Sequence, residues 1–264
     1  MSGTGGQWSD LAARFGSAIV MLVVGLAAVA AGGHIFHAFA ALLCAVMVWE
    51  LMRMLAPSDA QGALIIGGVS GAVGLVAIYA PFGLGLPLLF VPAFLGLTRL
   101  RSNRRIYVLY SVLIMVAGYG LMGVRDDFGL VWMLWLVAVV VVTDVAGYFA
   151  GRIFGGPKFW LRVSPKKTWS GTVAGWIGAV GVAIVFMVMS NADSVLIGVS
   201  VAVAMASQLG DIAESAIKRF VDVKDSSSLI PGHGGVLDRF DGMLGASAFL
   251  LVAGPIVGFP PVGV

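Results

Sequence analysis

The chain has 264 residues, of which 59% are hydrophobic and 11% are charged, and its mean hydropathy is +1.01. A soluble domain of this length needs far more polar surface than such a composition supplies, so we exclude a soluble globular fold. The formal net charge of +3 is small, and in a membrane protein the distribution of charge along the chain is more informative than its sum. We expect an all-α, polytopic integral membrane protein.

Apolar stretches of membrane-spanning length recur along the whole chain, with Gly and Pro at the joins. They predict about nine transmembrane helices in one membrane domain, residues 1–264, with N-terminal spans in 1–125 and catalytic spans in 126–264. The first run contains Ala28-Val29-Ala30, which is typical of a signal-peptide cleavage site, but we expect it to be retained as a span. The expected spans are about 16–32, 35–55, 62–80, 83–98, 106–123, 130–150, 171–190, 194–217 and 242–259.

The basic residues fall on one side of the membrane when these spans alternate across it. With the N-terminus on that side, every Lys and Arg except Arg125 lies there, including Arg14 at the start of the chain. A wrong span count would scatter them over both sides. The positive-inside rule makes this side cytoplasmic. We therefore expect a multi-pass protein of the cell (inner or plasma) membrane, with its N-terminus and its polar loops facing the cytoplasm.

The second and sixth predicted spans each contain an acid. Glu50 is near the end of the second span, and Asp144 lies in the segment TDVAGYFAGR, residues 143–152. An acid at membrane depth is costly and is functional by default. The signal from Glu50 is weaker because Arg53 lies one turn away, whereas Asp144 shares a helical face with glycines that allow close approach of another helix.

The loop before the seventh span reads SPKKTWSG, residues 164–171. A helix N-terminus offers unpaired N–H groups and the positive end of the helix dipole, and Lys166 and Lys167 add charge. The segment therefore predicts an anion site, although two lysines also serve to fix topology. The spacing of a Walker A loop is absent.

A polar stripe runs along the C-terminal part of the eighth predicted span and just beyond it, with Ser207, Asp211, Glu214, Ser215, Lys218 and Asp222 on one helical face. A carboxylate at membrane depth costs roughly 2.5–3.5 kcal/mol on insertion scales. Asp211 and Glu214 should therefore face a wet cavity, a metal ion or a basic partner. The alternative is a solvated helix end in which Glu214 and Lys218 form an i,i+4 pair.

A wet loop, IPGHGGVLDRFDG at residues 230–242, precedes the last span. Its glycines let the backbone pass close to a ligand or adopt positive φ. Asp238 and Asp241 share a face if the final helix has begun, and hard oxygen ligands of this kind suit Mg²⁺. The alternative is a Gly-rich turn with a helix-capping Asp. His233 is either a phosphate donor or acid/base group, or a simple turn residue.

Three blocks in this region resemble the signature of the phosphatidate cytidylyltransferases, also called CDP-diacylglycerol synthases. The blocks are SAIKR at 215–219, KD at 224–225 and LIPGHGGVLDRFD at 229–241, so the resemblance covers about 27 consecutive positions with several fixed polar residues. Upstream, the 143–152 segment, SPKKT and SQLGD at 207–211 follow in the order that the family shows. One departure is Ser226-Ser227-Ser228, where the family often has a bulkier residue followed by a small one.

The resemblance implies transfer of CMP from CTP to phosphatidic acid, which gives CDP-diacylglycerol and pyrophosphate for phospholipid biosynthesis. It implies Mg²⁺, with a second monovalent or divalent cation as a further candidate. The implied metal ligands are Asp211 and Asp238, with Asp144, Glu214 and Asp241 as further candidates. The implied catalytic residues are Asp211, Asp238, Asp241, Lys218 and His233. The implied substrate-binding residues are Ser164, Lys166, Lys167, Thr168, Arg219, Lys224, Gly234, Gly235 and Arg239.

The expected partners are CTP, phosphatidic acid and membrane lipids, with no nucleic acid and with a homodimer as a candidate assembly. Two other functions are kept as alternatives. A CTP-dependent kinase of a long-chain alcohol would also join lipid and nucleotide in a membrane bundle, but it would transfer the γ-phosphoryl group. A transporter would explain intramembrane acids, although the polar residues cluster on one side and no inverted repeat is visible.

Overall fold

The computed structural model describes residues 5–81 and 83–261, with side chains from Phe15 onward, so the N-terminus itself and the side chain of Arg14 lie outside the described residues. The named elements of the described chain are helices apart from one antiparallel hairpin, β1 paired with β2. The elements are α1 (Gly5–Ala31), α2 (Gly33–Leu55), α3 (Ala60–Tyr79), α4 (Gly85–Leu88), α5 (Val91–Leu97), α6 (Arg104–Asp127), α7 (Gly129–Ile153), β1 (Lys158–Trp160), β2 (Ser164–Thr168), α8 (Trp169–Ser190), α9 (Val195–Phe220) and α10 (Leu237–Val257).

Seven of the described helices, α2, α3 and α6 to α10, are long and apolar enough to cross a membrane. The prediction of an all-α polytopic membrane protein is confirmed. Two further apolar helices, Phe15–Ala31 and Gly85–Leu97, are shorter, and the nine-span count depends on them and stays a prediction. The expected span 83–98 is divided into α4 and α5, with Pro92 in the first turn of α5, where the N–H that proline lacks would have no helical partner.

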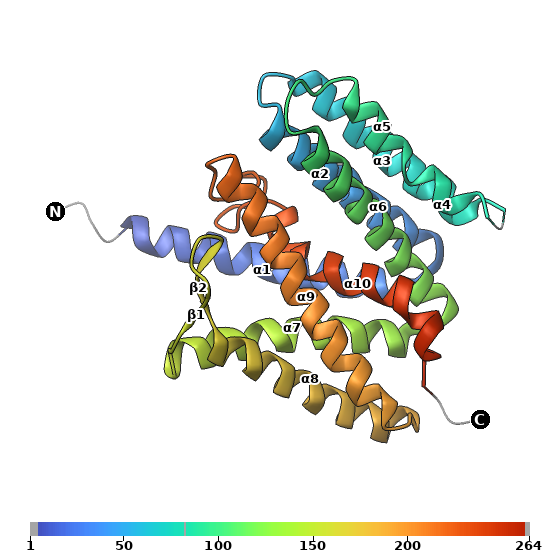
Figure 1. The fold of residues 1–264 in the computed structure, drawn as a ribbon, viewed down its shortest axis with the longest axis vertical. Coiled ribbons are helices and arrows are strands. Elements are labelled where there is room, and N and C mark those ends of the chain that lie inside the picture. The colour runs from blue at the N-terminus through green and yellow to red at the C-terminus, as the bar shows by residue number, and fades with distance from the viewer. Residues whose placement is uncertain (1–4, 82, 262–264) are drawn as a thin grey trace.

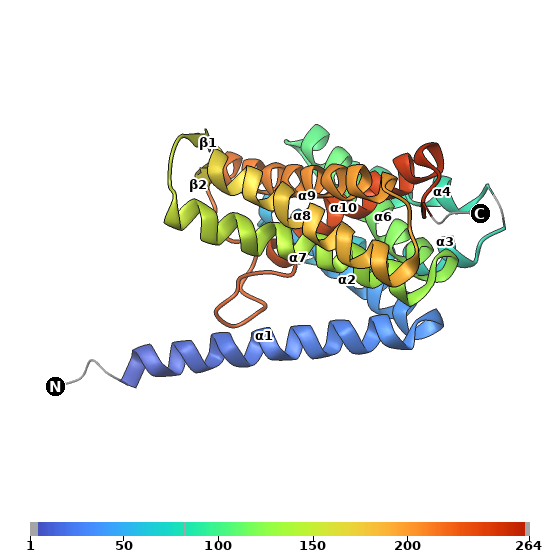
Figure 2. The same ribbon diagram turned by 90° about the horizontal axis from the view of Figure 1, so that it is seen from below.

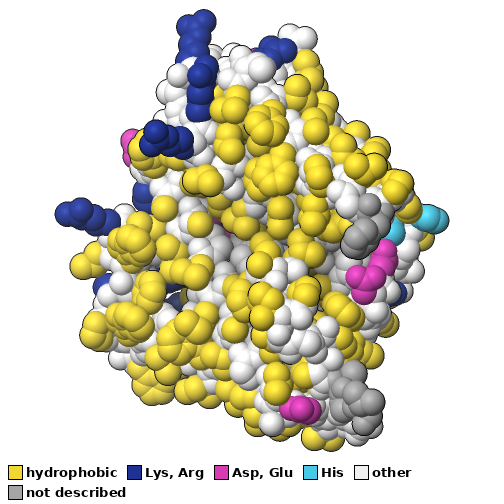
Figure 3. Space-filling view, turned by 45° about the vertical axis from the view of Figure 1, so that its right-hand side comes forward, with side chains coloured by type: hydrophobic (Ala, Val, Ile, Leu, Met, Phe, Trp, Pro, Cys, Tyr) yellow, Lys and Arg dark blue, Asp and Glu magenta, His cyan; other side chains and the backbone are white. Residues whose placement is uncertain are grey.

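The joins between helices alternate between two ends of the bundle. At one end, Arg99 lies 4.0 Å from Asp59, which places the α5–α6 join beside the α2–α3 join. At the other end, Nε2 of His37 lies 2.7 Å from Oδ2 of Asp126. Figure 3 shows Lys and Arg gathered along one edge of the molecule, acidic and His side chains at the opposite edge, and mainly hydrophobic side chains between them. This is the arrangement that a membrane-embedded bundle requires.

Helices α9 and α10 lie between two groups of helices and contribute to both hydrophobic cores (Figure 1). The first core is built mainly on α7, α8 and α9, around the fully buried Trp135, whose Nε1 donates to Ser200 Oγ at 3.0 Å. The second core joins α2, α3 and α6 to Ile217 on α9 and Leu237 on α10. Helix α1 runs along the outside of the bundle (Figure 2). Helices α9 and α10, which carry the predicted polar residues, are therefore packed against both hydrophobic cores.

The contact between α9 and α10 is close enough to exclude side chains. A Cβ added to Gly210 would lie 2.3 Å from the carbonyl oxygen of Asp241 and 2.9 Å from the amide nitrogen of Gly245. Small residues at a helix crossing let two backbones approach in this way. The crossing brings Asp211, the neighbour of Gly210, to the level of Asp241.

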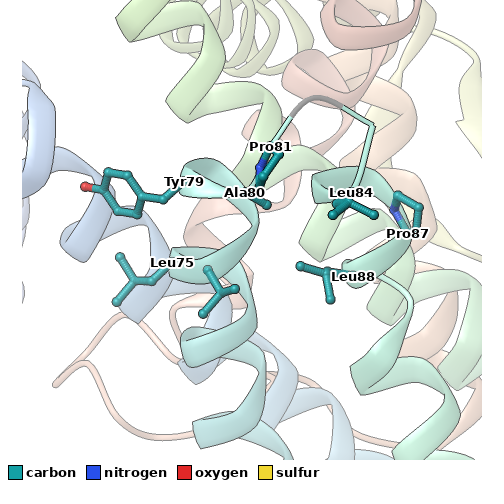
Figure 4. A pocket seen from close by; sticks show the side chains of 8 residues that line it. Leu75, Tyr79, Ala80, Pro81, Leu84, Pro87 and Leu88 are labelled. Atoms are coloured by element: carbon teal, nitrogen blue, oxygen red, sulfur yellow. The ribbon is translucent and has the colours of Figure 1, made fainter.

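A separate apolar groove of about 720 Å³ lies between α3 and α4, where Leu75, Tyr79 and Leu88 line it (Figure 4). The Tyr79 hydroxyl is hydrogen-bonded to Nδ1 of His37 at 2.7 Å. Because His37 lies at the end of the bundle opposite the basic edge, the groove is at that end as well. No acid or lysine lines it. It is therefore not the site that the sequence motifs predict.

Candidate active site

A cavity of about 520 Å³ opens between α7, α8, α9 and the β hairpin. Residues from three of the predicted motifs meet in its lining: the 143–152 segment, the SPKKT segment and the SQLGD segment. The predicted site residues that line it are Asp144, Lys166, Lys167, Thr168 and Asp211. Phe159, Tyr148, Arg152 and Gln208 also line it. A cavity with both acids and lysines in its wall can hold an anionic ligand together with a cation.

Two glycines and one threonine build the side of this cavity between α7 and α8. A Cβ at Gly171 would lie 2.5 Å from the carbonyl oxygen of Gly147, so the helices touch at their backbones. Thr168 is the N-cap of α8, and its Oγ1 accepts a 3.2 Å hydrogen bond from Gly171 N. Lys166 and Lys167 belong to strand β2, before the helix, and not to its first turn. The hairpin, more than a helix N-terminus, directs Lys167 to the cavity.

Asp211 is the acid that faces this cavity from α9. Lys167 forms an ion pair with its Oδ2, and Ser215 Oγ donates to its Oδ1 at 3.2 Å. The side chains of Lys167 and Asp211 are 28% and 27% exposed. This pair is therefore accessible to a ligand entering the cavity.

A second ionic cluster lies deeper, at the end of α9, where Lys218 contacts two acids. Its Nζ lies 2.5 Å from Oε2 of Glu214 and 2.6 Å from Oδ1 of Asp238. The side chains of Glu214 and Asp238 are 0% and 4% exposed, and that of Lys218 is 12% exposed. The i,i+4 pair considered as the alternative is thus formed, but it is buried, and it includes Asp238 from α10. A solvated helix end is therefore wrong for Glu214 and Lys218. Asp222, predicted on the same helical face, instead lies beyond the end of α9 and is exposed.

The glycine-rich loop wraps around Asp238. Its Oδ2 accepts hydrogen bonds from Ser226 N at 2.8 Å, Ser226 Oγ at 2.9 Å and Gly235 N at 2.7 Å. A Cβ at Gly235 would lie 2.0 Å from Ser226 Oγ, and Gly234 has a φ of +84°. Both glycines are needed for the loop to close on this carboxylate. Their placement accounts for the Gly-Gly pair without a direct substrate contact.

Asp241 lies between the two clusters, within electrostatic range of Asp211, Asp144 and Glu214. Acids from α7, α9 and α10 therefore converge. Over residues 5–81 and 83–261, no three acid or His side chains are close enough together to hold a metal ion as they stand. Lys167 and Lys218 pair with three of these acids, Asp211, Glu214 and Asp238.

Unpaired buried oxygens test whether this region suits a hard cation. Oε2 of Glu214 contacts only the Lys218 ammonium, and Oε1 of Glu214, the buried Ser207 Oγ and the Tyr110 hydroxyl lack a hydrogen-bond partner among the described residues. Buried oxygens without partners are costly and commonly mark an ion or water site. Carboxylate and hydroxyl oxygens are the ligands that Mg²⁺ prefers. The donor set therefore fits a divalent cation.

Several predicted residues do not line the cavity. Nδ1 of His233 is hydrogen-bonded to Ser17 Oγ on α1 at 2.7 Å, and the His233 carbonyl accepts from Arg239 Nη2 at 2.9 Å. Arg219 and Lys224 are exposed. Ser164 lies at the far end of β2 from the cavity-lining Thr168. The roles of these residues stay predictions.

Two features of the site were not predicted from the sequence. Tyr110, on α6, lies within electrostatic range of Glu214 and Asp241, but it is one aromatic residue in an apolar span and gives no sequence signal. Ser226 was identified only as a departure from the family pattern. The sequence signal that could have indicated a role for Ser226 was its position between two segments that carry acids.

A model of the cytidylyltransferase family matches residues 12–256. The chain belongs to the cytidylyltransferase family. A phosphatidate cytidylyltransferase of Staphylococcus saprophyticus is 33% identical over 245 residues, which cover 86% of this chain and 93% of the relative. One of Brucella suis is 44% identical over 139 residues, which cover 52% of each chain, so the match spans about half the length of that relative. The family resemblance predicted from the sequence is confirmed.

Proposed function

We propose that this cytidylyltransferase-family protein transfers CMP from CTP to phosphatidic acid, and that its site faces the cytoplasm. The observation that carries the proposal is the convergence of acids and lysines from α7, the β hairpin and α9 around one cavity of a membrane bundle. On the same helix α9, Lys218 joins Glu214 to Asp238 of α10. The names of the relatives support the same reaction. A wet cavity at one end of a lipid-embedded bundle lets a hydrophilic nucleotide meet a lipid headgroup.

The chemistry needs charge neutralisation more than a protein nucleophile. An oxygen of the phosphatidate phosphate forms a bond to the α-phosphorus of CTP, and the bond from the α-phosphorus to the oxygen bridging to the β-phosphorus breaks. Pyrophosphate leaves with the electron pair. Both substrates and the leaving group are anionic, so lysines that face them stabilise the charge that develops. Lys167, at the cavity, and Lys218, between two acids, have this role.

Asp211 and Asp238 would hold Mg²⁺, with Glu214, Asp144 and Asp241 available for a second cation. When bound, the ion supplies charge neutralisation on the triphosphate and on the departing pyrophosphate. With the charge of their acids neutralised by an ion, Lys167 and Lys218 would be available to contact phosphate oxygens. Asp238 stays fixed in direction by the loop donors at Ser226 and Gly235. The two lysines therefore pair with acids in the cation-free protein and would bind the anionic substrates in the loaded one.

Two groups of basic residues suit two separately bound anions. Lys166 and Lys167 form the first group, at the cavity. Lys218, Arg219, Lys224 and Arg239 form the second, around the glycine-rich loop. A triphosphate and a phosphomonoester need two such places, whereas a neutral alcohol acceptor needs one. This favours a cytidylyltransferase over a lipid-alcohol kinase.

The test is an assay of the purified protein in detergent with CTP, phosphatidic acid and Mg²⁺. We expect pyrophosphate and a cytidine-containing lipid, loss of both after chelation and recovery when Mg²⁺ is restored. Asp211→Asn should abolish the activity. Asp193→Asn, at the opposite end, should match the unsubstituted protein, because Asn can still accept the hydrogen bond that Val195 N donates to Asp193. Absence of cytidine lipid from well-folded protein would refute the proposal.

A further inference from the structure

Glu50 is a fully buried acid on α2, in the half of the chain that does not carry the family motifs. Its side chain is 0% exposed. No Lys, Arg or His of the described chain forms an ion pair with it. Arg53, one turn further along α2, donates instead to the carbonyl of Pro57 at 3.0 Å. A buried carboxylate without a cation requires another source of stabilisation.

That stabilisation comes from the segment that leads into α10. Oε1 of Glu50 accepts from Ser227 Oγ at 2.6 Å and from Val236 N at 2.9 Å. Oε2 accepts from Leu237 N at 2.7 Å and from Ser226 Oγ at 3.3 Å. Two of these donors are backbone N–H groups at the start of α10. Val236, the N-cap residue of α10, makes no side-chain capping bond. Glu50 caps α10 from a different helix, at the positive end of its dipole.

Asp238, on α10, accepts hydrogen bonds from the same segment. The Ser226 hydroxyl contacts Oε2 of Glu50 and Oδ2 of Asp238, at 3.3 Å and 2.9 Å. A Cβ at Gly235 would lie 2.4 Å from Oε1 of Glu50. Glu50 and Asp238 therefore hold one loop between them, and the orientation of Asp238 toward Lys218 depends on that loop.

We propose that Glu50 is a positioning residue for the active site. It fixes residues 226–237 from α2, and through Ser226 and the first turn of α10 it keeps Asp238 aimed at Lys218. The proposal rests on the proposed function, in which Asp238 belongs to the active site. It also gives the N-terminal helices a part in the reaction, beyond anchoring the protein in the membrane.

Each oxygen of Glu50 accepts from two donors. Glu50→Gln therefore tests these hydrogen bonds without changing the size of the side chain. The amide keeps the size of the side chain but has one acceptor, and its NH₂ group would face the N–H of Val236 or Leu237. A donor placed against a donor leaves both without a partner. We expect kcat of Glu50→Gln to fall at least about tenfold at saturating CTP and phosphatidate.

Hydrogen exchange separates positioning from a general loss of folding. In Glu50→Gln, amides of residues 223–239 should exchange faster, while α7 and α8 exchange as in the unsubstituted protein. The matched control is His37→Gln, which alters a buried polar residue at the opposite end of the same helix. We expect it to leave kcat per folded molecule and exchange in 223–239 unchanged.

Ser226→Ala gives a milder second variant and a test of coupling. Because Glu50 acts partly through Ser226, the double variant Glu50→Gln/Ser226→Ala should lose less kcat than the product of the two single losses. Unchanged exchange in 223–239, or an unchanged kcat, in Glu50→Gln would overturn the positioning role. If Glu50→Gln does not fold, unchanged exchange in Ser226→Ala would overturn it. Absence of cytidine lipid from the unsubstituted protein would instead refute the proposed function, and the exchange experiment would still decide the role of Glu50.

Discussion

Lys218 shows how single residues in this site serve both stability and chemistry. Its ammonium lies between Glu214 and Asp238, and all three side chains are buried or nearly so. Breaking a buried ion pair by removing one partner is far more destabilising than removing both, because an uncompensated charge remains. The cation-free protein therefore depends on Lys218 to keep two acids inside the bundle.

This predicts a specific pattern of stability. Lys218→Met leaves Glu214 without its cation and should lower the free energy of unfolding by about 3–5 kcal/mol. The double variant Glu214→Gln/Lys218→Met should recover most of that loss but no activity. Thermal unfolding in detergent measures both, with Arg101→Met at an exposed position as the control. Equal destabilisation of the single and double variants would contradict the account.

Side chains on one helical face were predictable, and contacts across the fold were not. The spacing of Asp211, Glu214 and Lys218 on a helix is set by sequence alone, so the polar stripe could be predicted. The bonds from Ser226 to Glu50 and Asp238 join residues up to 176 positions apart, and no periodicity encodes them. Arg53 gave a misleading signal, because its own helix end provides a closer acceptor at Pro57.

At the scale of elements, the crossing of α9 and α10 places the acids relative to one another. Gly210 and Gly245 are in backbone contact there, and a Cβ at Gly245 would lie 2.1 Å from the carbonyl oxygen of Ala206. Any side chain at these positions must push the helices apart. Asp211 and Asp241 flank this contact, so their separation follows from it.

Gly210→Ala should therefore reduce both stability and activity. Overpacking of this kind costs about 1–3 kcal/mol, and the displaced α10 should carry Asp241 away from Asp211. Gly198→Ala is the matched control, because it lies on the same helix and a Cβ there would meet nothing within 4 Å. Comparison of unfolding temperature and kcat for the two variants provides the test. Equal unfolding temperatures and kcat values for the two variants would show that the α9–α10 crossing does not determine the positions of the acids.

Hydropathy predicted most helices within a few residues, because apolar length is what a bilayer selects. The β hairpin was not predicted. Residues 164–168 were expected at a helix N-terminus, but they pair with Lys158–Trp160 and the helix begins at Trp169. Strand pairing of so short a segment depends on its partner, not on local periodicity.

At the scale of the whole molecule, the motif-bearing loops lie at one end of the bundle, and we propose that this end faces the cytoplasm. The Arg99–Asp59 and His37–Asp126 contacts fix which joins share an end. The excess of basic residues at one end supports the proposal that this end faces the cytoplasm.

Single cysteines test this topology in a Cys44→Ser background, since Cys44 is the only native cysteine. We expect cysteines at Ser102 and Leu161 to react with an impermeant reagent only from the cytoplasmic side. Cysteines at Asp127 and Asp193 should react only from the outside. All four positions are exposed. Labelling of all four from one side would contradict both the alternation and the nine-span count.

The most direct test of the central claim follows the phosphorus atoms of CTP. Parallel reactions of the purified protein with α-labelled and γ-labelled CTP, phosphatidic acid and Mg²⁺ are extracted, and the label in the lipid phase is counted. Cytidylyl transfer predicts α-label in the lipid and γ-label in free pyrophosphate, because the lipid phosphate attacks the α-phosphorus. Label from the γ position in the lipid, with none from the α position, would show a kinase and contradict the assignment.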